Sequence, residues 1–229
     1  KAYFKKKFKN IQIICSGKNL GYGKGNNLGL KKIKTDYALI LNPDIICEKN
    51  FFKNLSKIIS SKIDFNVIGC QYKKEKIFMP AGYFQIEKNN EFKEKFYKKK
   101  IHSLNKVEWV VGCSMLINLK KFKKSEIFDK KYFLFFEEFD MCKTTVDNGG
   151  KIYLSKDLKV DHLGFKSSLG KNLNEENNAI NVKNWHWMWS SFYFYKKHYG
   201  ISKAIYTFSG KLIKSFLKII YFSITFQQN

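Results

Sequence analysis

Three acidic residues stand close together in the stretch FFEEFD, between Phe135 and Asp140. A carboxylate can take the proton of an attacking hydroxyl group, so Glu137, Glu138 and Asp140 are candidates for a general base. Acids are also favourable at the start of a helix, where they oppose the positive end of the helix dipole. Glu138 and Asp140 are two residues apart and cannot share one helix face. At a site, one carboxylate would point inward while the other fixes a neighbouring segment.

Another candidate acid, Asp44, follows the apolar run DYALIL and the pair Asn42-Pro43. Ligands of open α/β sheets bind at the carboxyl ends of strands, and a carboxylate placed there can hold a hard divalent cation. The competing interpretation is a plain turn that ends the strand. His162 follows a later apolar run and is a candidate metal ligand, although a lone histidine is more often structural.

A glycine-rich stretch, NLGYGKGNNLG, runs from Asn19 to Gly29. It contains three glycines at alternate positions, Gly21, Gly23 and Gly25. Such a loop can expose backbone N–H groups to a phosphate at the start of a helix. The stretch has Asn26 where the dinucleotide-binding fingerprint needs its last glycine, and it lacks the G-K-[ST] of a P-loop. A flexible connection between a strand and a helix explains the glycines equally well.

Strands and helices alternate in the elements that would position these residues. Apolar runs predict strands at Asn10–Ser16, Asp36–Leu41, Phe65–Tyr72, Ile77–Ile86, Val107–Asn118, Lys151–Leu154 and Leu158–His162. Helices are predicted at Asn26–Lys34, Phe51–Ser60 and Glu137–Asn148, and from about Asn174 onward. The Lys-rich stretch Lys88–Lys100 is typical of a solvated loop or a short helix. This order predicts an α/β sandwich with a mostly parallel sheet.

The composition indicates a globular protein with a large basic surplus. Of the 229 residues 44% are hydrophobic and 17% aromatic, and the formal net charge is +24. Every basic residue is Lys. Specific recognition of bases and phosphates usually relies on the planar fork of Arg, so we expect no nucleic-acid partner. The charge permits other anionic partners.

The cysteines and the first residues bear on the compartment. Cys15, Cys47, Cys70, Cys113 and Cys142 include no C-x-x-C pair, which fits reduced cytosolic thiols rather than disulfides or a zinc site. The chain begins with Lys1 and shows no signal peptide, so we expect it to start inside a longer protein. No long uncharged apolar run predicts a membrane-spanning helix.

The C-terminal part is aromatic and then lysine-rich. Asn184–Tyr199 contains three of the four tryptophans, which suits a helix covering the core, an acceptor platform or an interfacial belt. On a helical wheel Lys203, Lys211, Lys214 and Lys218 fall within about 80° of one another. The opposite side carries Ile201, Ile205, Phe208, Leu212, Phe216 and Ile219. This pattern fits a helix in an anionic membrane surface, or an amphipathic helix docked on the domain.

Five segments, in this order and spacing, resemble the inverting family 2 glycosyltransferases of the GT-A fold, in particular their rhamnosyltransferase-like branch. They are NLGYGKGNNLG at Asn19–Gly29, LILNPD at Leu39–Asp44, VEWVVGCSMLI at Val107–Ile117, FDKKYFLFFEEFDMC at Phe128–Cys142 and VDHLG at Val160–Gly164. The resemblance implies a GT-A domain over residues 1–170, without its first two strands, and a helical extension over residues 171–229. The chain is therefore expected to be a fragment, and titration with UDP, dTDP and GDP in the presence of Mn²⁺ tests whether it holds its donor alone.

The resemblance also implies roles for the candidate residues. Asp44 and His162 would hold Mg²⁺ or Mn²⁺ on the donor diphosphate. Glu138 occupies the position of the catalytic base, where the family usually has Asp, with Glu137 as the preceding acid and an alternative base and Asp140 as the second acid. The donor site would comprise Asn19, Gly21, Gly23, Gly25, Asn26, Asn42 and Asp44. The acceptor and sugar pocket would comprise Trp109, Gly112, Cys113 and Ser114.

The activity implied is inverting transfer of a hexosyl or deoxyhexosyl unit, such as rhamnosyl, from a nucleoside-diphosphate sugar to a polysaccharide or lipid-linked glycan. It would take place in the cytoplasm, with the chain at the inner face of the plasma membrane. One carboxylate for the hydroxyl proton and one cation for the leaving diphosphate are what a single displacement requires. The alternative is a non-catalytic remnant of a transferase, or a basic module that binds anionic surfaces.

Overall fold

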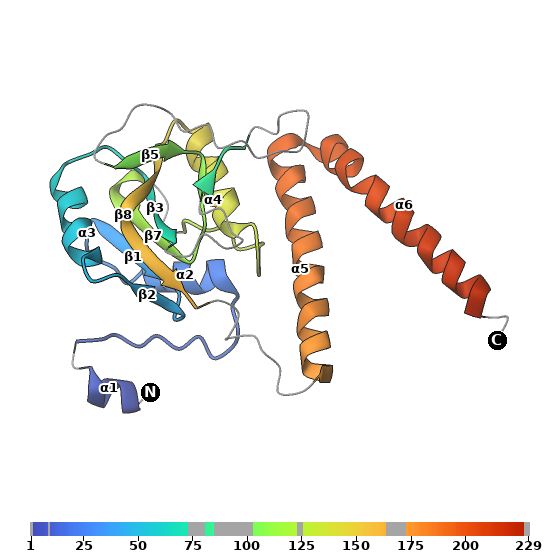
Figure 1. Cartoon of the computed structure of the whole chain (residues 1–229), viewed down its shortest axis with the longest axis horizontal. Helices are drawn as coiled ribbons and strands as arrows, with labels where there is room; N and C mark the ends of the chain where they lie inside the picture. Colours follow the sequence, from blue (N-terminus) through green and yellow to red (C-terminus); the bar gives the residue numbers. More distant parts are fainter. Residues whose placement is uncertain are drawn as a thin grey trace.

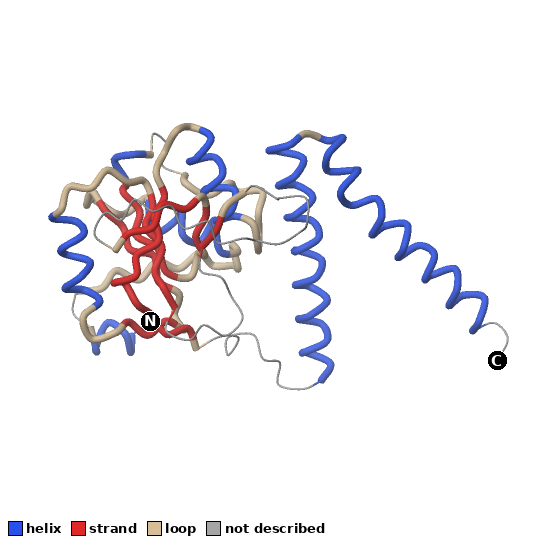
Figure 2. The backbone as a smooth tube through the Cα atoms, turned by 45° about the horizontal axis from the view of Figure 1, so that its top comes forward, coloured by secondary structure: helices blue, strands red, loops and turns tan. Residues whose placement is uncertain are grey.

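The structure, a computed structural model, describes residues 2–8, 10–72, 81–84, 103–122, 126–163 and 173–226. An α/β body is followed by two long helices, which stand beside it (Figures 1 and 2). The helices are α1 (Ala2–Lys7), α2 (Tyr22–Leu30), α3 (Phe51–Ser60), α4 (Glu137–Asp147), α5 (Leu173–Tyr199) and α6 (Ile201–Phe226), with a 3-10 turn at Leu119–Lys121. The strands are β1 (Tyr37–Leu41), β2 (Ile45–Cys47), β3 (Val67–Tyr72), β4 (Ala81–Gly82), β5 (Leu104–Val107), β6 (Trp109–Val110), β7 (Ser114–Asn118) and β8 (Ile152–His162).

The central sheet is mixed. Its strand order is β1-β7-β3-β8-β2, and β5 also pairs with β8. Among the described strands of this sheet, β3 and β8 form the parallel pair, whereas the other pairings are antiparallel. The expectation of a mostly parallel sheet is therefore wrong. Its cause is that β2 and β7 follow irregular segments rather than crossover helices, so each can run opposite to its neighbours.

The two faces of the sheet carry separate halves of the core. Side chains alternate between the faces along each strand, so Met115 and Ile117 of β7 lie in one cluster and Leu116 lies in the other. The first cluster includes Leu30 of α2 and Met141 of α4. The second is covered by α3. Helices α2 and α4 thus share one face of the sheet, which brings the glycine-rich stretch and the acidic stretch to the same side.

Several expected elements have other boundaries. Asn10–Ser16 is irregular, because no described strand adjoins it to pair its backbone, and Ile11 and Ile14 are exposed. Helix α2 already begins at Tyr22, inside the glycine-rich stretch. The run Val107–Asn118 is broken around Gly112, whereas Lys151–His162 forms one continuous strand from Ile152. Lys88–Lys100 and most of Ile77–Ile86 lie outside the described residues.

The C-terminal helices form a hairpin that turns at Gly200, where φ is +87°. Helix α5 runs alongside the body, and α6 leaves the hairpin at an angle (Figure 1). The contact between α5 and the body includes the buried residues Ser190 and Phe194, and the Phe194 ring packs against Phe84 and Phe136. Ser190 donates a hydrogen bond from its hydroxyl to the carbonyl oxygen of Leu134 at 2.8 Å. Within the described residues, no helix combines the length and apolarity needed to cross a membrane.

Candidate functional site

The start of α4 is held in an unusual backbone conformation. Phe135 and Phe136 have φ values of +67° and +66°, a region that aromatic residues rarely adopt. Both rings pack against Trp187 of α5, with ring centroids 5.3 and 5.1 Å apart. Strained residues of this kind persist only where surrounding contacts hold them. The aromatic contacts with α5 therefore set the direction in which α4 begins, and with it the placement of Glu137 and Glu138.

Glu138 is partly buried and lies against Gly112. The backbone N–H of Gly112 donates a hydrogen bond to the Glu138 carboxylate, while burial raises the pKa of this carboxyl above its usual range. A Cβ atom on Gly112 would stand 3.3 Å from the Cβ of Glu138 and 2.8 Å from the hydroxyl oxygen of Tyr22. That hydroxyl donates to the carbonyl oxygen of Gly112. Only glycine fits between Tyr22 and Glu138 without displacing one of them.

Glu137 points to a different environment. Its side chain is 3% exposed and packs against Gly23 of α2, where an added Cβ would lie 3.4 Å from the Cβ of Glu137. Its Oε2 atom has no hydrogen-bond partner among the described residues. Burial, together with the neighbouring Glu138 charge, raises the pKa of Glu137 to about 8. At neutral pH this carboxyl is therefore mostly protonated.

Asp140 joins α4 to α5. Its carboxylate is 2% exposed and accepts hydrogen bonds from Lys197 and His198, each at 2.8 Å, and from the Tyr132 hydroxyl at 3.2 Å. Lys197 also reaches Asp129, at 2.8 Å. Both carboxylate oxygens of Asp140 thus accept structural hydrogen bonds, and this side chain holds α5 against α4.

The Asn42-Pro43-Asp44 turn brings Asp44 to His162. The Oδ2 atom of Asp44 lies 3.2 Å from the Nε2 atom of His162. Two backbone contacts hold this arrangement: Leu163 N–H donates to the Asp44 carbonyl at 3.0 Å, and Asn42 N–H donates to the Cys113 carbonyl at 2.9 Å. The pairing of β2 with β8 places Ile45 opposite His162. Residues at two separate strand ends therefore meet in one place, as the candidate metal ligands require.

The donor set at this turn fits a small divalent cation. A carboxylate and an imidazole offer an oxygen and a nitrogen ligand, and Mg²⁺ is usually held by one or two protein side chains together with substrate phosphates. Among the described residues no third His, Cys, Asp or Glu joins the pair. The remaining positions around an ion would belong to phosphate and water.

A chain of contacts connects the turn to the candidate base. The Asn42 N–H donates to the carbonyl oxygen of Cys113. The residue before Cys113, Gly112, donates its N–H to the Glu138 carboxylate and accepts the Tyr22 hydroxyl at its carbonyl oxygen. The break between β6 and β7 is thus the junction of the three segments singled out in the sequence. The structure brings the glycine-rich, Asn-Pro-Asp and acidic stretches to this junction.

The glycine-rich stretch is shaped by its neighbours. Gly21 has φ +76°, and a Cβ added there would lie 2.0 Å from the carbonyl oxygen of Phe133. The Tyr22 N–H donates to the same oxygen at 3.2 Å. Asn19 accepts from the Gly21 N–H at 2.9 Å, and the Asn26 amide donates to the Tyr22 carbonyl at 3.0 Å. The amide groups of Asn19 and Asn26 are therefore used in local contacts.

Asn27 is a residue that the sequence interpretation missed. It is 3% exposed, and its amide donates to the Phe128 carbonyl at 2.7 Å. Its Oδ1 accepts the N–H groups of Ile127 and Phe128 at 3.1 and 3.0 Å. Asn27 thereby ties α2 to the segment that leads into α4. An amide on the apolar face of a helix, one turn from Gly23, was the available signal.

Three residues expected around the sugar pocket lie in the core. Trp109 is 7% exposed, Cys113 5% and Ser114 2%. The indole of Trp109 packs on Phe139, with ring centroids 4.9 Å apart, and its Nε1–H donates to the Tyr83 carbonyl at 3.3 Å. These three side chains are thus covered by the fold, and within Trp109–Ser114 it is the Gly112 backbone that touches Glu138.

Comparison with known proteins places the chain among sugar transferases. The sequence profile described as glycosyl transferase family 2 matches residues 1–125. The chain is 29% identical to rhamnosyltransferase WbbL of Escherichia coli (strain K12) over 145 residues, which cover 56% of this chain and 54% of WbbL. It is 25% identical over 141 residues to the low-salt glycan biosynthesis hexosyltransferase Agl10 of Haloferax volcanii, covering 58% and 45% of the two chains. It thus spans about half the length of the curated relatives it matches.

A solved structure is similar in fold. The crystal structure of GalNAc-T7 with UDP, GalNAc and Mn²⁺ matches with a TM-score of 0.50 and 12% sequence identity. The match covers 93% of this chain and 48% of that chain. At this identity the likeness concerns the fold alone.

Proposed function

Because the chain belongs to glycosyl transferase family 2, we propose that it transfers a hexosyl or deoxyhexosyl unit, such as rhamnosyl, from a nucleoside-diphosphate sugar to a glycan acceptor. The fold is the expected GT-A type, with a mixed sheet. The observation that carries the proposal is the junction at Gly112, which links Glu138 to the turn that holds Asp44 beside His162. A base and a candidate cation site joined in this way suit one displacement at a sugar carbon.

Glu138 is the general base in this proposal. It takes the proton of the acceptor hydroxyl as the new glycosidic bond forms and the nucleoside diphosphate leaves, which inverts the anomeric carbon. Burial raises its pKa, which makes the carboxylate a stronger base, and the Gly112 N–H keeps it in place. Glu137 is less suited, because it is buried, has an unpartnered oxygen and stays protonated up to about pH 8. Asp140 is a positioning residue in this proposal, because it holds α5 against the start of α4.

Asp44 and His162 would hold Mg²⁺ or Mn²⁺. A divalent cation supplies stabilisation of the negative charge that develops on the leaving diphosphate. The 3.2 Å contact between the two side chains, at the ends of separate strands, supports this role.

The donor is proposed to lie along the glycine-rich stretch. The N–H groups of Gly21 and Gly25 bond to Asn19 and to the Gly21 carbonyl, and Gly23 is buried. The part of the stretch proposed to meet the donor is therefore the exposed surface at Gly25, together with Asn42 beside Asp44. An added Cβ at Gly25 would meet nothing within 4 Å, so this part of the surface is open to a ligand. The acceptor is proposed to approach Glu138 beside Gly112 and to be a polysaccharide or lipid-linked glycan at the cytoplasmic face of the plasma membrane.

The test is a screen of nucleoside-diphosphate sugars with the full chain, with and without Mn²⁺, in which release of the diphosphate is measured. We expect one donor class to be cleaved in the presence of metal, and Glu138→Gln to abolish the release. The rival function is a non-catalytic remnant that binds anionic surfaces. No release from any donor, or equal release by Glu138→Gln, would favour that rival and contradict the proposal.

A further inference from the structure

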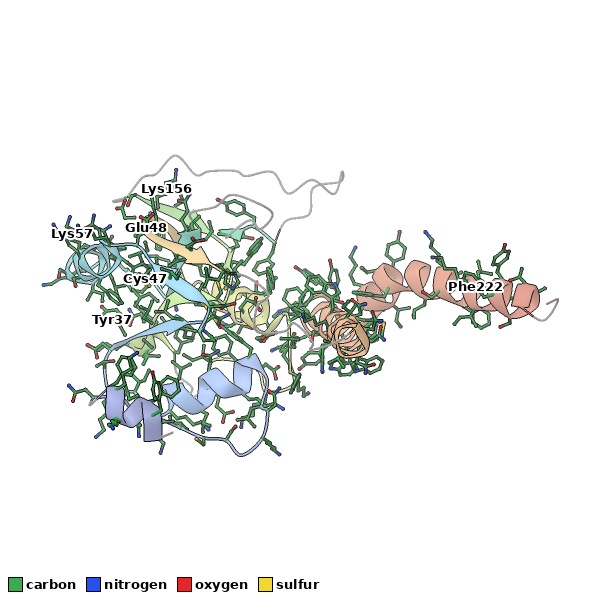
Figure 3. The ribbon with its side chains drawn as sticks, turned by 60° about the horizontal axis from the view of Figure 1, so that its bottom comes forward. Tyr37, Cys47, Glu48, Lys57, Lys156 and Phe222 are labelled. Atoms are coloured by element: carbon green, nitrogen blue, oxygen red, sulfur yellow. The ribbon has the colours of Figure 1, made fainter. Side chains whose placement is uncertain are left out.

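The distal part of α6 presents an exposed apolar surface. From Leu212 to Thr225 every residue is exposed, and the helix points away from the body (Figures 1 and 3). Figure 3 labels Phe222 far from the sheet. Nine large apolar side chains lie here, 39–63% exposed: Leu212, Ile213, Phe216, Leu217, Ile219, Ile220, Tyr221, Phe222 and Ile224. A continuous apolar surface of this kind marks a binding surface.

Helix α5 adds two tryptophans and a methionine on the face turned away from the body. Trp185 is 61% exposed, Met188 45% and Trp189 48%. Their spacing of three and four residues puts them on one face, while the buried Ser190 and Phe194 belong to the opposite face. Near the hairpin turn α6 packs against α5 through Phe208, whose ring lies 5.8 Å from Phe192 and 5.6 Å from Tyr195. The exposed side chains of both helices therefore belong to one hairpin.

The charge of α6 has a single sign. The helix contains four lysines and no acidic residue. Lys203, Lys214 and Lys218 are exposed and fall within about 60° of one another at 100° per residue, beside the apolar arc. They are spread along the helix rather than gathered at one end. A helix with this arrangement can lie in the plane of an interface, its lysines toward phosphate groups and its apolar arc toward acyl chains.

We propose that the α5–α6 hairpin binds the surface of an anionic lipid bilayer. Helix α6 lies in the interface, and the exposed tryptophans of α5 sit at the level of the headgroups, where Trp is favoured. This inference rests on the exposed surface and charge of the hairpin, and it holds whether or not the chain transfers a sugar. Where a sugar is transferred, it places the acceptor on the same membrane.

The first experiment separates the hairpin from the general basic charge. The full chain is floated with vesicles of phosphatidylcholine alone and with vesicles that also contain phosphatidylglycerol. Lys214→Glu/Lys218→Glu is compared with Lys53→Glu/Lys57→Glu, which makes the same charge change at exposed positions on α3. Since each lysine near an anionic surface contributes about 1 kcal/mol, the α6 pair should weaken binding about thirtyfold or more. Equal losses for both pairs would overturn the proposal, because the net charge of the chain would then explain binding.

The second experiment tests insertion. Phe216→Ser/Ile219→Ser removes two exposed side chains that no described residue covers, so the body should keep its near-ultraviolet circular dichroism while vesicle binding falls. Trp185 and Trp189 should be quenched by brominated lipids, and Trp185→Phe/Trp189→Phe should lose most of that quenching. The competing occupant of the surface is a second copy of the chain. A dimer that dissociates in Phe216→Ser/Ile219→Ser, together with no binding of anionic vesicles by the wild type, would overturn the proposal.

Discussion

The Nε2 atom of His198 on α5 lies 2.8 Å from the Oδ1 atom of Asp140 on α4. Lys197, the preceding residue, reaches the other oxygen of the same carboxylate at 2.8 Å. Asp140 stands two residues after Glu138, within the first turn of α4. Through one buried carboxylate, α5 therefore holds the turn that presents the proposed base, and the C-terminal region contributes to the geometry of the site.

Asp140→Ala should lower the free energy of unfolding by about 2–3 kcal/mol, because it removes a buried acceptor of charge-assisted hydrogen bonds from Lys197 and His198. Urea unfolding of the full chain measures this. The control is Asp36→Asn, which removes an exposed ion pair with Lys120 and should cost little stability, because solvent screens such a pair. If both variants lose the same stability, Asp140 does not hold α5 in the way inferred.

Glu138→Gln should lower the rate of sugar transfer by at least about 100-fold, since a general base typically contributes that much or more. Glu137→Gln should keep most of the activity, because its carboxyl is buried and protonated at neutral pH. Initial rates with saturating donor compare the two. The opposite ranking would make Glu137 the base and would contradict the proposed roles.

Local pattern was enough to predict several elements and to single out the three segments that meet at Gly112. The apolar run Asp36–Leu41 and the run Phe51–Ser60 predicted β1 and α3, whose buried residues include Ala38 and Ile40 in β1 and Phe51 and Ile58 in α3. The acids, the Asn-Pro-Asp turn and the glycine-rich stretch were recognised from residue types and spacing alone. The connection of these segments through Gly112 was not predicted, because the need for glycine there arises only from the contacts of Tyr22 and Glu138 in the folded chain.

The features that could not be predicted from the sequence depend on contacts between residues far apart in the chain. Asn10–Ser16 has a strand-like pattern, but none of the strands that the structure describes adjoins it, and pairing is not encoded within seven residues. The direction of β7 is set by its position between β1 and β3. Asp140 looked like one of three equivalent acids, yet its contacts come from residues 57 and 58 positions later. The roles of neighbouring acids are thus decided by tertiary contacts.

The stability of the chain should fall as pH rises from about 5 to 8. The pKa of Glu137 is about 8 in the folded chain, above its ordinary value of 4.5. Between these values the unfolded chain releases a proton that the folded chain keeps, so stability is full at low pH and decreases by up to about 1.4 kcal/mol per pH unit. Urea unfolding at pH 5, 6.5 and 8 measures the slope. Glu137→Gln should reduce the slope, and the part that remains belongs to Glu138, whose pKa burial also raises. An unchanged slope would show that Glu137 does not titrate in this range.

Removal of either side chain of the Asp44–His162 pair should weaken Mn²⁺ binding. In the presence of a nucleoside diphosphate, we expect Asp44→Asn and His162→Ala each to raise the Kd for Mn²⁺ about tenfold or more, measured by paramagnetic resonance of the free ion. Asp161→Asn is the matched control, because Asp161 precedes His162 in β8 and its side chain points to the opposite face. Loss of Mn²⁺ affinity in the control alone would place the cation elsewhere.

Gly112→Ala should lower both stability and activity. Its methyl group would stand 2.8 Å from the Tyr22 hydroxyl oxygen and 3.3 Å from the Cβ of Glu138, so one of them must move, at a cost of about 1–3 kcal/mol. Gly29→Ala is the control, because nothing lies within 4 Å of an added Cβ there and alanine favours the helix by about 1 kcal/mol.

A double variant separates the effect of the Gly112→Ala clash with Tyr22 from that of its clash with Glu138. Tyr22→Phe removes the nearer atom, so the double variant Gly112→Ala/Tyr22→Phe should recover part of the lost stability, measured by urea unfolding. Activity should recover only where Glu138 returns to its place, because a displacement of about 1 Å at the base can cost about 100-fold in rate. A Gly112→Ala variant with wild-type rate would mean that the contact between Gly112 and Glu138 does not position the base.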